Sequence, residues 1–434
     1  MVATKGTRIL TRPGHPDFLD LPWDRRLEDW KGDQIVEVAR GVHRHVVRFL
    51  DVDGALYALK EMPSRLVRRE YGMLRRMSEE GLPVVELVGS VNRTAVDVAD
   101  GPLEDVLLTR YLDYSLPYRT LFQHRRHRIV VDNPDDIRGL HERLLDALAM
   151  LLVRMHLNGF YWGDCSLSNT LFRRDAGALA VYIVDLETGE YHQQLTPGQR
   201  AADLEVTELN VAGGLMDLQA EFGLPPHPDP VDTAADLVRR YERLWEELNE
   251  EVIVGPDERY RIEARVRRLN ELGFDVDEVE LVASDGGDEL RLRTSVTEQG
   301  HHRRRLESLT GLEAQENQAR SLLNDLANFR AARERRLGRS LPDAVAAYQW
   351  LSEIFEPVAE AIPEELRGKL EPVEVFHEII EHKWFLSEQA GMDVGMEEAM
   401  KSYLGTVLPD IPDERAVVGE PEATDGEEGW IGFG

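Results

Sequence analysis

The 434-residue chain has one cysteine and no long apolar run. The lone Cys165 excludes an internal disulfide and any metal site made of several cysteines, and it fits a reducing cytoplasm. No stretch approaches the roughly 18 consecutive apolar residues that a spanning helix needs, so we expect no membrane span. The N-terminus, MVATKGTRILTRPGHPD, lacks the apolar core of a signal peptide, and we therefore expect a cytoplasmic protein.

Positive charge is also scarce. The chain has 51 Lys and Arg against 81 Asp and Glu, for a formal net charge of −30. Because the summed field repels phosphates, no nucleic acid is expected as the main partner. Only six of the 51 basic residues are lysines, so a lysine at a structured position such as Lys60 calls for a specific reason.

The spacing of apolar residues from position 33 predicts an antiparallel meander and then alternating helices and strands. The expected strands are 34–39, 45–51, 55–61, 84–91, 106–112, 170–173 and 180–185, and the expected helices are 64–80 and 136–157. Past residue 200 the patterning is mostly helical, over 201–222, 232–251, 261–272, 313–338, 342–361, 371–390 and 395–404, with a hairpin within 278–295. This order predicts an α+β region followed by a mainly α-helical domain.

Composition and breaks suggest four segments. We expect an extended N-terminal segment over 1–32, an α+β domain over 33–251, a mainly helical domain over 259–410 and an acidic, disordered tail over 411–434.

The strongest chemical signal is the segment Gly163-Asp164-Cys165-Ser166-Leu167-Ser168-Asn169, followed by a hydrophobic strand that ends at Asp185. Phosphoryl transfer needs one carboxylate to orient an acceptor hydroxyl and take its proton, which Asp164 could do. It also needs oxygen ligands for Mg²⁺, which Asn169 and Asp185 could supply. A polar loop with surface aspartates is the alternative.

Two upstream residues give this motif a context. Lys60 ends the strand sequence Leu56-Tyr57-Ala58-Leu59-Lys60, and Glu70 lies on the helix expected next. In kinases a strand lysine contacts the nucleotide phosphates and is held by a helix glutamate. The alternative for Lys60 is a solvated lysine at a strand edge.

With these parts in this order, residues about 33–200 resemble the protein-kinase-like superfamily, and most closely its bacterial lipopolysaccharide (Kdo/heptose) kinase-like branch. The resemblance implies a bilobal fold that uses ATP and Mg²⁺. It implies that Lys60 contacts phosphate, with Glu70 as its ion-pair partner. It also makes Asp164 the catalytic base and Asn169 and Asp185 the metal ligands.

Further expectations come from the same resemblance. Main-chain groups of Arg110, Tyr111 and Leu112, in a hinge near 109–113, would face the adenine. Gly41 is the one glycine left of the family's glycine-rich loop, and Trp162 replaces the usual loop histidine. Ser166 replaces the lysine typical of Ser/Thr kinases, which argues against an ordinary protein kinase. Residues 259–410 resemble the uncharacterised domain that follows such regions in actinobacterial proteins.

The resulting functional expectation is an ATP- and Mg²⁺-dependent phosphotransferase that acts on a hydroxyl of a sugar, a lipid-linked saccharide or a small metabolite. The alternative is a nucleotide-binding pseudokinase or scaffold, whose helical domain or tail recruits a protein partner.

Three weaker signals remain. The basic islands 124–128 and 301–305 predict either a charge-balanced surface or an anion site, and we expect Arg303–Arg305 to contact an anionic group of the acceptor. His377 and His382 lie five residues apart and so do not share a helix face as metal ligands would, which favours solvated pairs with Glu381 and Glu378. Cys165 is expected to be a packed side chain rather than a nucleophile.

Overall fold

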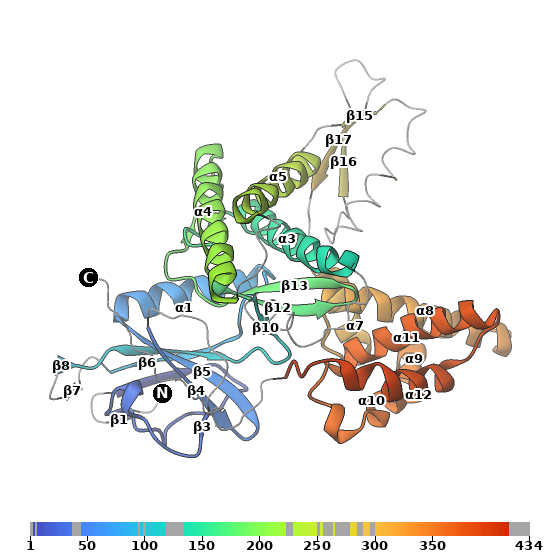
Figure 1. Ribbon diagram of the computed structural model, residues 1–434, viewed down its shortest axis with the longest axis horizontal. Helices are drawn as coiled ribbons and strands as arrows, with labels where there is room; N and C mark the ends of the chain where they lie inside the picture. Colours follow the sequence, from blue (N-terminus) through green and yellow to red (C-terminus); the bar gives the residue numbers. More distant parts are fainter. Residues whose placement is uncertain are drawn as a thin grey trace. The chain divides into compact units, whose positions relative to one another are not determined.

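The computed structural model describes residues 3–4, 7–36, 45–93, 96–98, 101–118, 134–222, 229–249, 252–254, 264, 278–283, 290–295 and 300–415. It divides into two compact units (Figure 1). Unit 1 comprises residues 1–67, 87–111 and 416–434, and unit 2 comprises residues 68–86 and 112–415. Strands dominate the described part of unit 1 and helices that of unit 2, which confirms the α+β class. No helix in the described ranges is long and apolar enough to cross a membrane.

Unit 1 holds a seven-stranded antiparallel sheet in the order β1-β2-β6-β9-β5-β4-β3. Its strands are β1 (Ala3–Thr4), β2 (Thr7–Thr11), β3 (Ile35–Val36), β4 (Val46–Val52), β5 (Ala55–Met62), β6 (Leu87–Asn92) and β9 (Asp105–Arg110). A separate ribbon pairs β7 (Asp97–Val98) with β8 (Gly101–Pro102). The turn predicted at Asp53-Gly54 is confirmed, with both residues at positive φ.

Side chains along β5 alternate between two faces, as they must in a strand. Tyr57 and Leu59 join the apolar core on one face, whereas Ala58 and Lys60 point to the other. The segment between β2 and β3 contributes Trp23, Leu27 and Trp30 to that same core, and 27–29 form the 3₁₀ turn η1 (Leu27–Asp29). Sequence patterning favoured an extended segment here; its aromatic residues instead pack on the sheet that carries Lys60.

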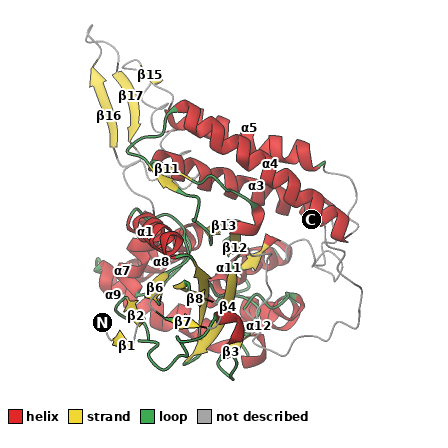
Figure 2. Cartoon of the chain, turned by 90° about the vertical axis from the view of Figure 1, so that its left-hand side faces the viewer, coloured by secondary structure: helices red, strands yellow, loops and turns green. Residues whose placement is uncertain are grey.

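Unit 2 contains most of α1 (Ser64–Glu79) and a group of three long helices that pack on one another, as Figure 2 shows. Those helices are α3 (Pro134–Leu157), α4 (Pro197–Phe222) and α5 (Pro230–Asn249). The short elements among them are β10 (Leu116–Pro117), β11 (Phe160–Tyr161), η2 (Leu167–Asn169), β12 (Thr170–Asp175), β13 (Ala178–Ile183) and β14 (Glu190–Tyr191). After α5 come the strands β15 (Val252–Val254), β16 (Glu278–Ala283) and β17 (Leu290–Ser295).

The rest of unit 2 is helical. It contains α7 (His301–Thr310), α8 (Glu316–Leu337), α9 (Asp343–Trp350), η3 (Leu351–Phe355), α10 (Glu356–Ala361), η4 (Glu364–Leu366), α11 (Pro372–Ala390), α12 (Met396–Thr406) and η5 (Leu408–Asp410). Trp350, Phe355 and Phe376 meet in its core, with ring centroids 5.3 to 5.8 Å apart. The helices predicted around 313–338, 371–390 and 395–404 are confirmed, while the one predicted at 261–272 lies outside the described residues except at position 264.

The β12–β13 hairpin is joined to these helices by buried hydrogen bonds. Asp175, at the end of β12, accepts from the Gln318 backbone N–H at 2.9 Å and from Asn317 Nδ2 at 3.0 Å, and so caps α8. Glu374 accepts from Gln318 Nε2 at 2.6 Å and from the Ala176 N–H at 3.1 Å. The hairpin is therefore held from its tip by two helices that come much later in the chain.

A second set of contacts holds the sides of the hairpin. Tyr182 donates to Gln315 Oε1 at 2.7 Å, and Arg174 pairs with Glu414 at 2.8 Å. Glu414 is buried, although the tail was expected to begin at 411. The acidic run itself lies in 416–434, outside the described residues.

One half-buried carboxyl predicts a pH-dependent stability. Burial raises the pKa of Glu378 to about 7, against the opposing effect of Arg174. Since the unfolded chain loses this proton at a lower pH, the group's contribution to stability is present below about pH 4 and is lost as the pH rises through about 7. Glu378→Gln should therefore raise the free energy of unfolding by about 1–2 kcal/mol at pH 8 and change it little near pH 4.

Thermal unfolding at both pH values checks this, with Glu388→Gln, an exposed position on the same helix, as the matched control. An equal effect of Glu378→Gln at pH 4 and pH 8 would contradict the assignment.

Candidate active site

The segment with the strongest sequence signal forms a tight loop between β11 and η2. Gly159 ends α3 at a φ of 77°, and a Cβ there would lie 2.0 Å from the His192 carbonyl oxygen, so the chain can turn only with glycine. β11 then pairs with β14, which begins shortly after Asp185 in the sequence. This pairing brings the loop and the segment after Asp185 to the same place.

Asp164 and Asn169, predicted as base and metal ligand, are in direct contact. Asn169 Nδ2 donates to the Asp164 carbonyl oxygen at 3.1 Å and to Asp164 Oδ2 at 3.3 Å. Because the amide nitrogen makes these bonds, the amide oxygen of Asn169 is the atom that could bind a metal ion. Both side chains are half-buried, so a ligand could reach them.

Asp185 adjoins this pair through the backbone. The Val184 N–H donates to the Asn169 carbonyl oxygen at 3.1 Å, and Trp162 Nε1 donates to the Asp185 carbonyl oxygen at 3.1 Å. The Glu187 N–H donates to Asp185 Oδ1 at 3.1 Å and fixes the carboxylate. The structure thus gathers Asp164, Asn169 and Asp185, the three unit 2 residues predicted for acceptor and metal.

A fully buried carboxylate on α4 fixes the start of the loop. Asp203 accepts from the Trp162 N–H at 2.8 Å and from the Gly163 N–H at 2.7 Å. It also bonds His156 Nε2 at 3.0 Å, and the other ring nitrogen of His156 lies 2.8 Å from the Tyr241 hydroxyl. Three helices, α3, α4 and α5, are thereby linked beneath the residue that precedes Asp164.

Residues on one face of α4 contact successive residues of the loop. Asp203, Thr207 and Asn210 are spaced by four and three positions, so they lie on one side of the helix. Thr207 hydrogen-bonds the thiol of Cys165, whose pKa is raised by complete burial. Cys165 is therefore a packed side chain, as predicted, and not an exposed thiolate.

Asn210 reaches the predicted base itself. Its Nδ2 donates to Asp164 Oδ1 at 3.1 Å, while Asn169 binds the other carboxylate oxygen. Two amides from different elements thus set the plane of the Asp164 carboxylate.

The helix that carries Glu70 is held against the loop after Asp185. Arg69 donates to the Gly189 carbonyl oxygen at 3.0 Å and to the Thr188 carbonyl oxygen at 2.9 Å, and the Arg76 guanidinium lies 3.3 Å from the centroid of the Tyr191 ring. Glu70 itself is buried.

Lys60 lies in unit 1, on the face of the sheet opposite the core that holds Tyr57 and Leu59. The same face carries a small apolar cluster that includes Phe49, Ala58 and Tyr111, with the Phe49 and Tyr111 rings 5.7 Å apart. A lysine on the same face of the sheet as an apolar cluster suits a ligand with an aromatic base and phosphates.

The other residues predicted to contact the nucleotide are three hinge residues and Gly41. Arg110 pairs with Tyr57 in the sheet, and the Tyr111 N–H already donates to the Leu56 carbonyl oxygen at 2.9 Å. The Leu112 carbonyl oxygen accepts from the Ser115 hydroxyl at 2.6 Å. The predicted adenine contacts therefore depend on the other main-chain N–H and C=O groups of the hinge. Gly41 lies outside the described residues.

The structure also bears on the predicted histidine pairs and on the two basic islands. The pairing of His377 with Glu381 is confirmed at 3.4 Å, but its description as solvated was wrong, because His377 is buried and bonds Ser321. His382 bonds Ser402 instead of Glu378. No group of three or more His, Cys, Asp or Glu side chains that could hold a metal ion occurs in the described ranges. The island 124–128 lies outside them, and 301–305 forms the start of α7.

Two segments of the chain match two different protein families. Residues 45–212 match the lipopolysaccharide kinase (Kdo/WaaP) family. This segment is a kinase-like, phosphotransferase-type domain. Residues 243–408 match a domain of unknown function, DUF4032. Both matches agree with the resemblance seen in the sequence.

Other comparisons add little to the kinase-like domain. No curated protein matches the chain. A solved structure titled "WaaP in complex with acyl carrier protein" is 22% identical, covers 48% of this chain and 90% of that chain, and has a TM-score of 0.30. A superposition of this quality assigns no residue of the present chain.

Sequence reasoning missed Asp203, Thr207 and Asn210, which support the loop of the kinase-like domain. Their spacing on a predicted helix was visible, but polar residues at such spacing usually mark a solvated face. Only the packing of α4 against the loop shows that this face is buried.

Asp203 should be the residue of α4 on which folding depends most. Asp203→Ala leaves the Trp162 and Gly163 N–H groups and His156 without an acceptor, so we expect a loss of roughly 3–5 kcal/mol in the free energy of unfolding. Denaturant unfolding measures it, with the exposed Asp217→Ala as a control on the same helix. A loss no larger than that of the control would contradict the anchoring role.

Proposed function

We propose that the chain transfers a phosphoryl group from Mg·ATP to a hydroxyl of a saccharide or another small metabolite. Asp164 orients the acceptor hydroxyl and takes its proton, and Asn169 and Asp185 hold Mg²⁺. Lys60 contacts the nucleotide phosphates and Glu70 positions Lys60. Since ATP is the donor, the expected compartment is the cytoplasm, which the single cysteine fits.

The observation that carries this proposal is the contact between Asp164 and Asn169 beside Asp185, within the segment that matches a kinase family. Bound Mg²⁺ would neutralise phosphate charge. The oxygen-only chemistry of an amide and a carboxylate is what that ion prefers. Asp164 keeps its side chain at a reachable surface while both its oxygens are oriented, as a positioned base requires.

Asn210 has a positioning role in this proposal. The loop has Ser166 where Ser/Thr kinases have a lysine, and Asn210 donates to Asp164 from α4 instead. A neutral amide orients the carboxylate without adding a positive charge next to the acceptor. The absence of this charge suits an uncharged substrate that carries a hydroxyl group.

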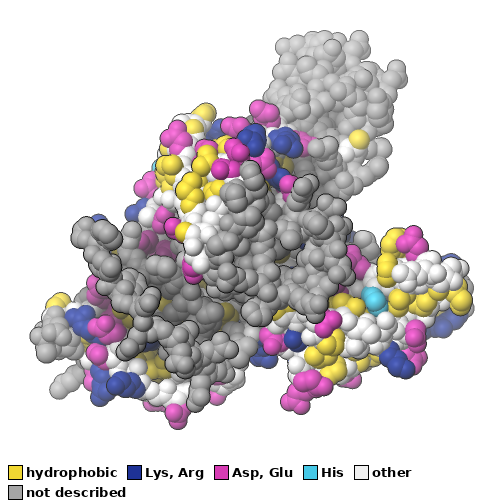
Figure 3. All heavy atoms as spheres, in the orientation of Figure 1, with side chains coloured by type: hydrophobic (Ala, Val, Ile, Leu, Met, Phe, Trp, Pro, Cys, Tyr) yellow, Lys and Arg dark blue, Asp and Glu magenta, His cyan; other side chains and the backbone are white. Residues whose placement is uncertain are grey.

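A small acceptor also suits the charge of the molecule. On the face shown in Figure 3, basic side chains among the described residues lie in small groups between acidic ones. With a net charge of −30, the chain offers no long-range attraction to a polyanion. A neutral saccharide or a small metabolite meets no such repulsion.

The first test concerns the nucleotide. Mg·ATP should raise the melting temperature of the wild-type protein, because a ligand at about 100 times its Kd adds about 2.7 kcal/mol of stability. Lys60→Ala and Asp185→Asn should each remove most of that shift. Absence of a shift in the wild type would count against the kinase function.

A second test separates chemistry from binding. Asp164→Asn should keep the shift with Mg·ATP and lose turnover by about 10²–10⁴-fold, because a positioned base contributes that much. ATP consumption with fractionated cell extract measures turnover. A wild-type protein that binds Mg·ATP but shows no more turnover than Asp164→Asn on any fraction would favour the pseudokinase alternative.

A third test concerns Asn210. Asn210→Ala should lower kcat by about 10–100-fold, the worth of a hydrogen bond to a charged group, with the nucleotide shift unchanged. Asn210→Asp should be worse, because it places a second carboxylate against Asp164. Leu209→Ala, exposed on the same helix, is the control. Equal activity of Asn210→Ala and the control would remove the positioning role.

A further inference from the structure

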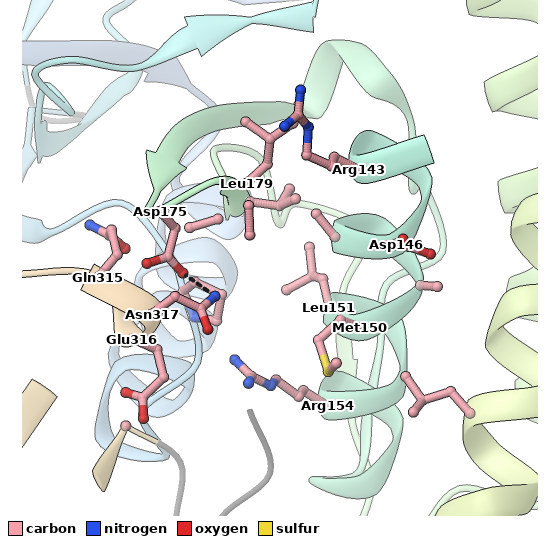
Figure 4. A pocket seen from close by; sticks show the side chains of 18 of the residues that line it. Arg143, Asp146, Met150, Leu151, Arg154, Asp175, Leu179, Gln315, Glu316 and Asn317 are labelled. Atoms are coloured by element: carbon pink, nitrogen blue, oxygen red, sulfur yellow. Dashed lines mark hydrogen bonds between the residues drawn. The ribbon is translucent and has the colours of Figure 1, made fainter. Parts of the chain in front are cut away.

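A cavity of about 500 Å³ lies within unit 2, away from the loop just described. Figure 4 shows α3 along one side, with Arg143, Met150, Leu151 and Arg154, and the start of α8 opposite. The β12–β13 hairpin closes it at Asp175 and Leu179, and α5, the first turn of α7 and the residues just after α1 supply the remaining wall. This volume is that of a small-molecule site. None of Asp164, Asn169 or Asp185 lines the cavity.

Most of the wall is aliphatic. Side chains without polar atoms come from three elements, namely Ala147, Ala149 and Leu151 on α3, Leu179, Ala180 and Val181 on β13, and Leu244 on α5. Such a surface gains free energy when an apolar body displaces water from it.

Two arginines supply the charge. Arg154 points from α3 across the cavity toward Glu316, and Arg303 on α7 lines the same cavity. Burial lowers the pKa of the Arg154 guanidinium, the carboxylates of Glu316 and Asp175 oppose this effect, and the like charge of Arg303 adds to it. Two guanidinium groups thus line one cavity.

The nearby carboxylates are largely engaged elsewhere. Glu316 accepts from His302 Nδ1 at 2.7 Å and from the backbone N–H groups of His302 and Arg303 at 3.2 and 3.4 Å. Asp175 caps α8, and burial raises its pKa to about 6. Glu316 and Asp175 both attract Arg154 and also accept hydrogen bonds from other donors. An anionic ligand in the cavity would add a negative charge facing both Arg154 and Arg303.

We propose that this cavity binds a small molecule with an apolar body and one phosphate or carboxylate group, the oxyanion lying between Arg154 and Arg303. Guanidinium groups bind either oxyanion through paired N–H donors. The site draws Arg154 from the segment that matches the kinase family and Arg303 from the segment that matches DUF4032. The ligand therefore contacts both segments at once.

This assignment gives the arginines of the basic island 301–305 different roles. Arg303 lines the cavity, whereas Arg304 and Arg305 do not. Contact of all three arginines with the phosphotransfer acceptor stays a prediction, while the cavity gives Arg303 a separate ligand.

The test is calorimetric titration of the full chain with 1-naphthyl phosphate and with 1-naphthoate, which share an apolar body and differ in the oxyanion. Inorganic phosphate lacks the body and 1-naphthol lacks the charge, so both should bind at least about tenfold more weakly. Arg303→Gln should weaken binding by about tenfold or more, because it removes a charged hydrogen-bond donor. Arg305→Gln, exposed on the same helix, should have no effect.

Preference for one of the two anionic probes decides between phosphate and carboxylate. The same titration on Lys60→Ala should give unchanged binding, which separates this site from the nucleotide site and from the fate of the kinase proposal. The inference is overturned if neither anionic probe binds, if 1-naphthol binds as well as they do, or if Arg303→Gln and Arg305→Gln behave alike. Loss of binding in Lys60→Ala would place the probe at the nucleotide site instead.

Discussion

The buried carboxylate of Asp203 is the group on which the candidate active site depends. It accepts two backbone N–H groups of the loop and bonds His156, which in turn contacts Tyr241. A carboxylate out of water is tolerated only when its oxygens are fully used, and here the partners come from the loop and from α3. The bonds that satisfy Asp203 are thus the same bonds that place the residue before Asp164.

The α4 helix extends this principle along the loop. Each turn offers a different chemical group: a carboxylate for N–H donors, a hydroxyl for the thiol of Cys165 and an amide for the carboxylate of Asp164. The loop itself has little regular structure, so its conformation is imposed by the helix beneath it. Ser166 stands where Ser/Thr kinases have a lysine, and the donor that orients Asp164, the base in our proposal, comes from Asn210 on α4.

The helical domain supports the same site from another direction. Asp175 and Glu374 join the tip of the β12–β13 hairpin to α8 and α11, and the hairpin runs directly from Asn169 toward Asp185. The two predicted metal ligands therefore lie at the open ends of a hairpin whose closed end is anchored in the domain of unknown function. This arrangement gives that domain a structural part in the site without any catalytic group of its own.

Sequence by itself determined the class of chemistry and the local elements. The spacing of Asp164, Asn169 and Asp185, the Lys60 strand and the turn at Asp53-Gly54 are local patterns, since strand alternation, turn residues and a loop motif all act within a few positions. The tertiary structure decided which polar residues are buried. Asp203, His377 and Glu414 look like surface residues in the sequence, and only long-range packing supplies the partners that let them leave water.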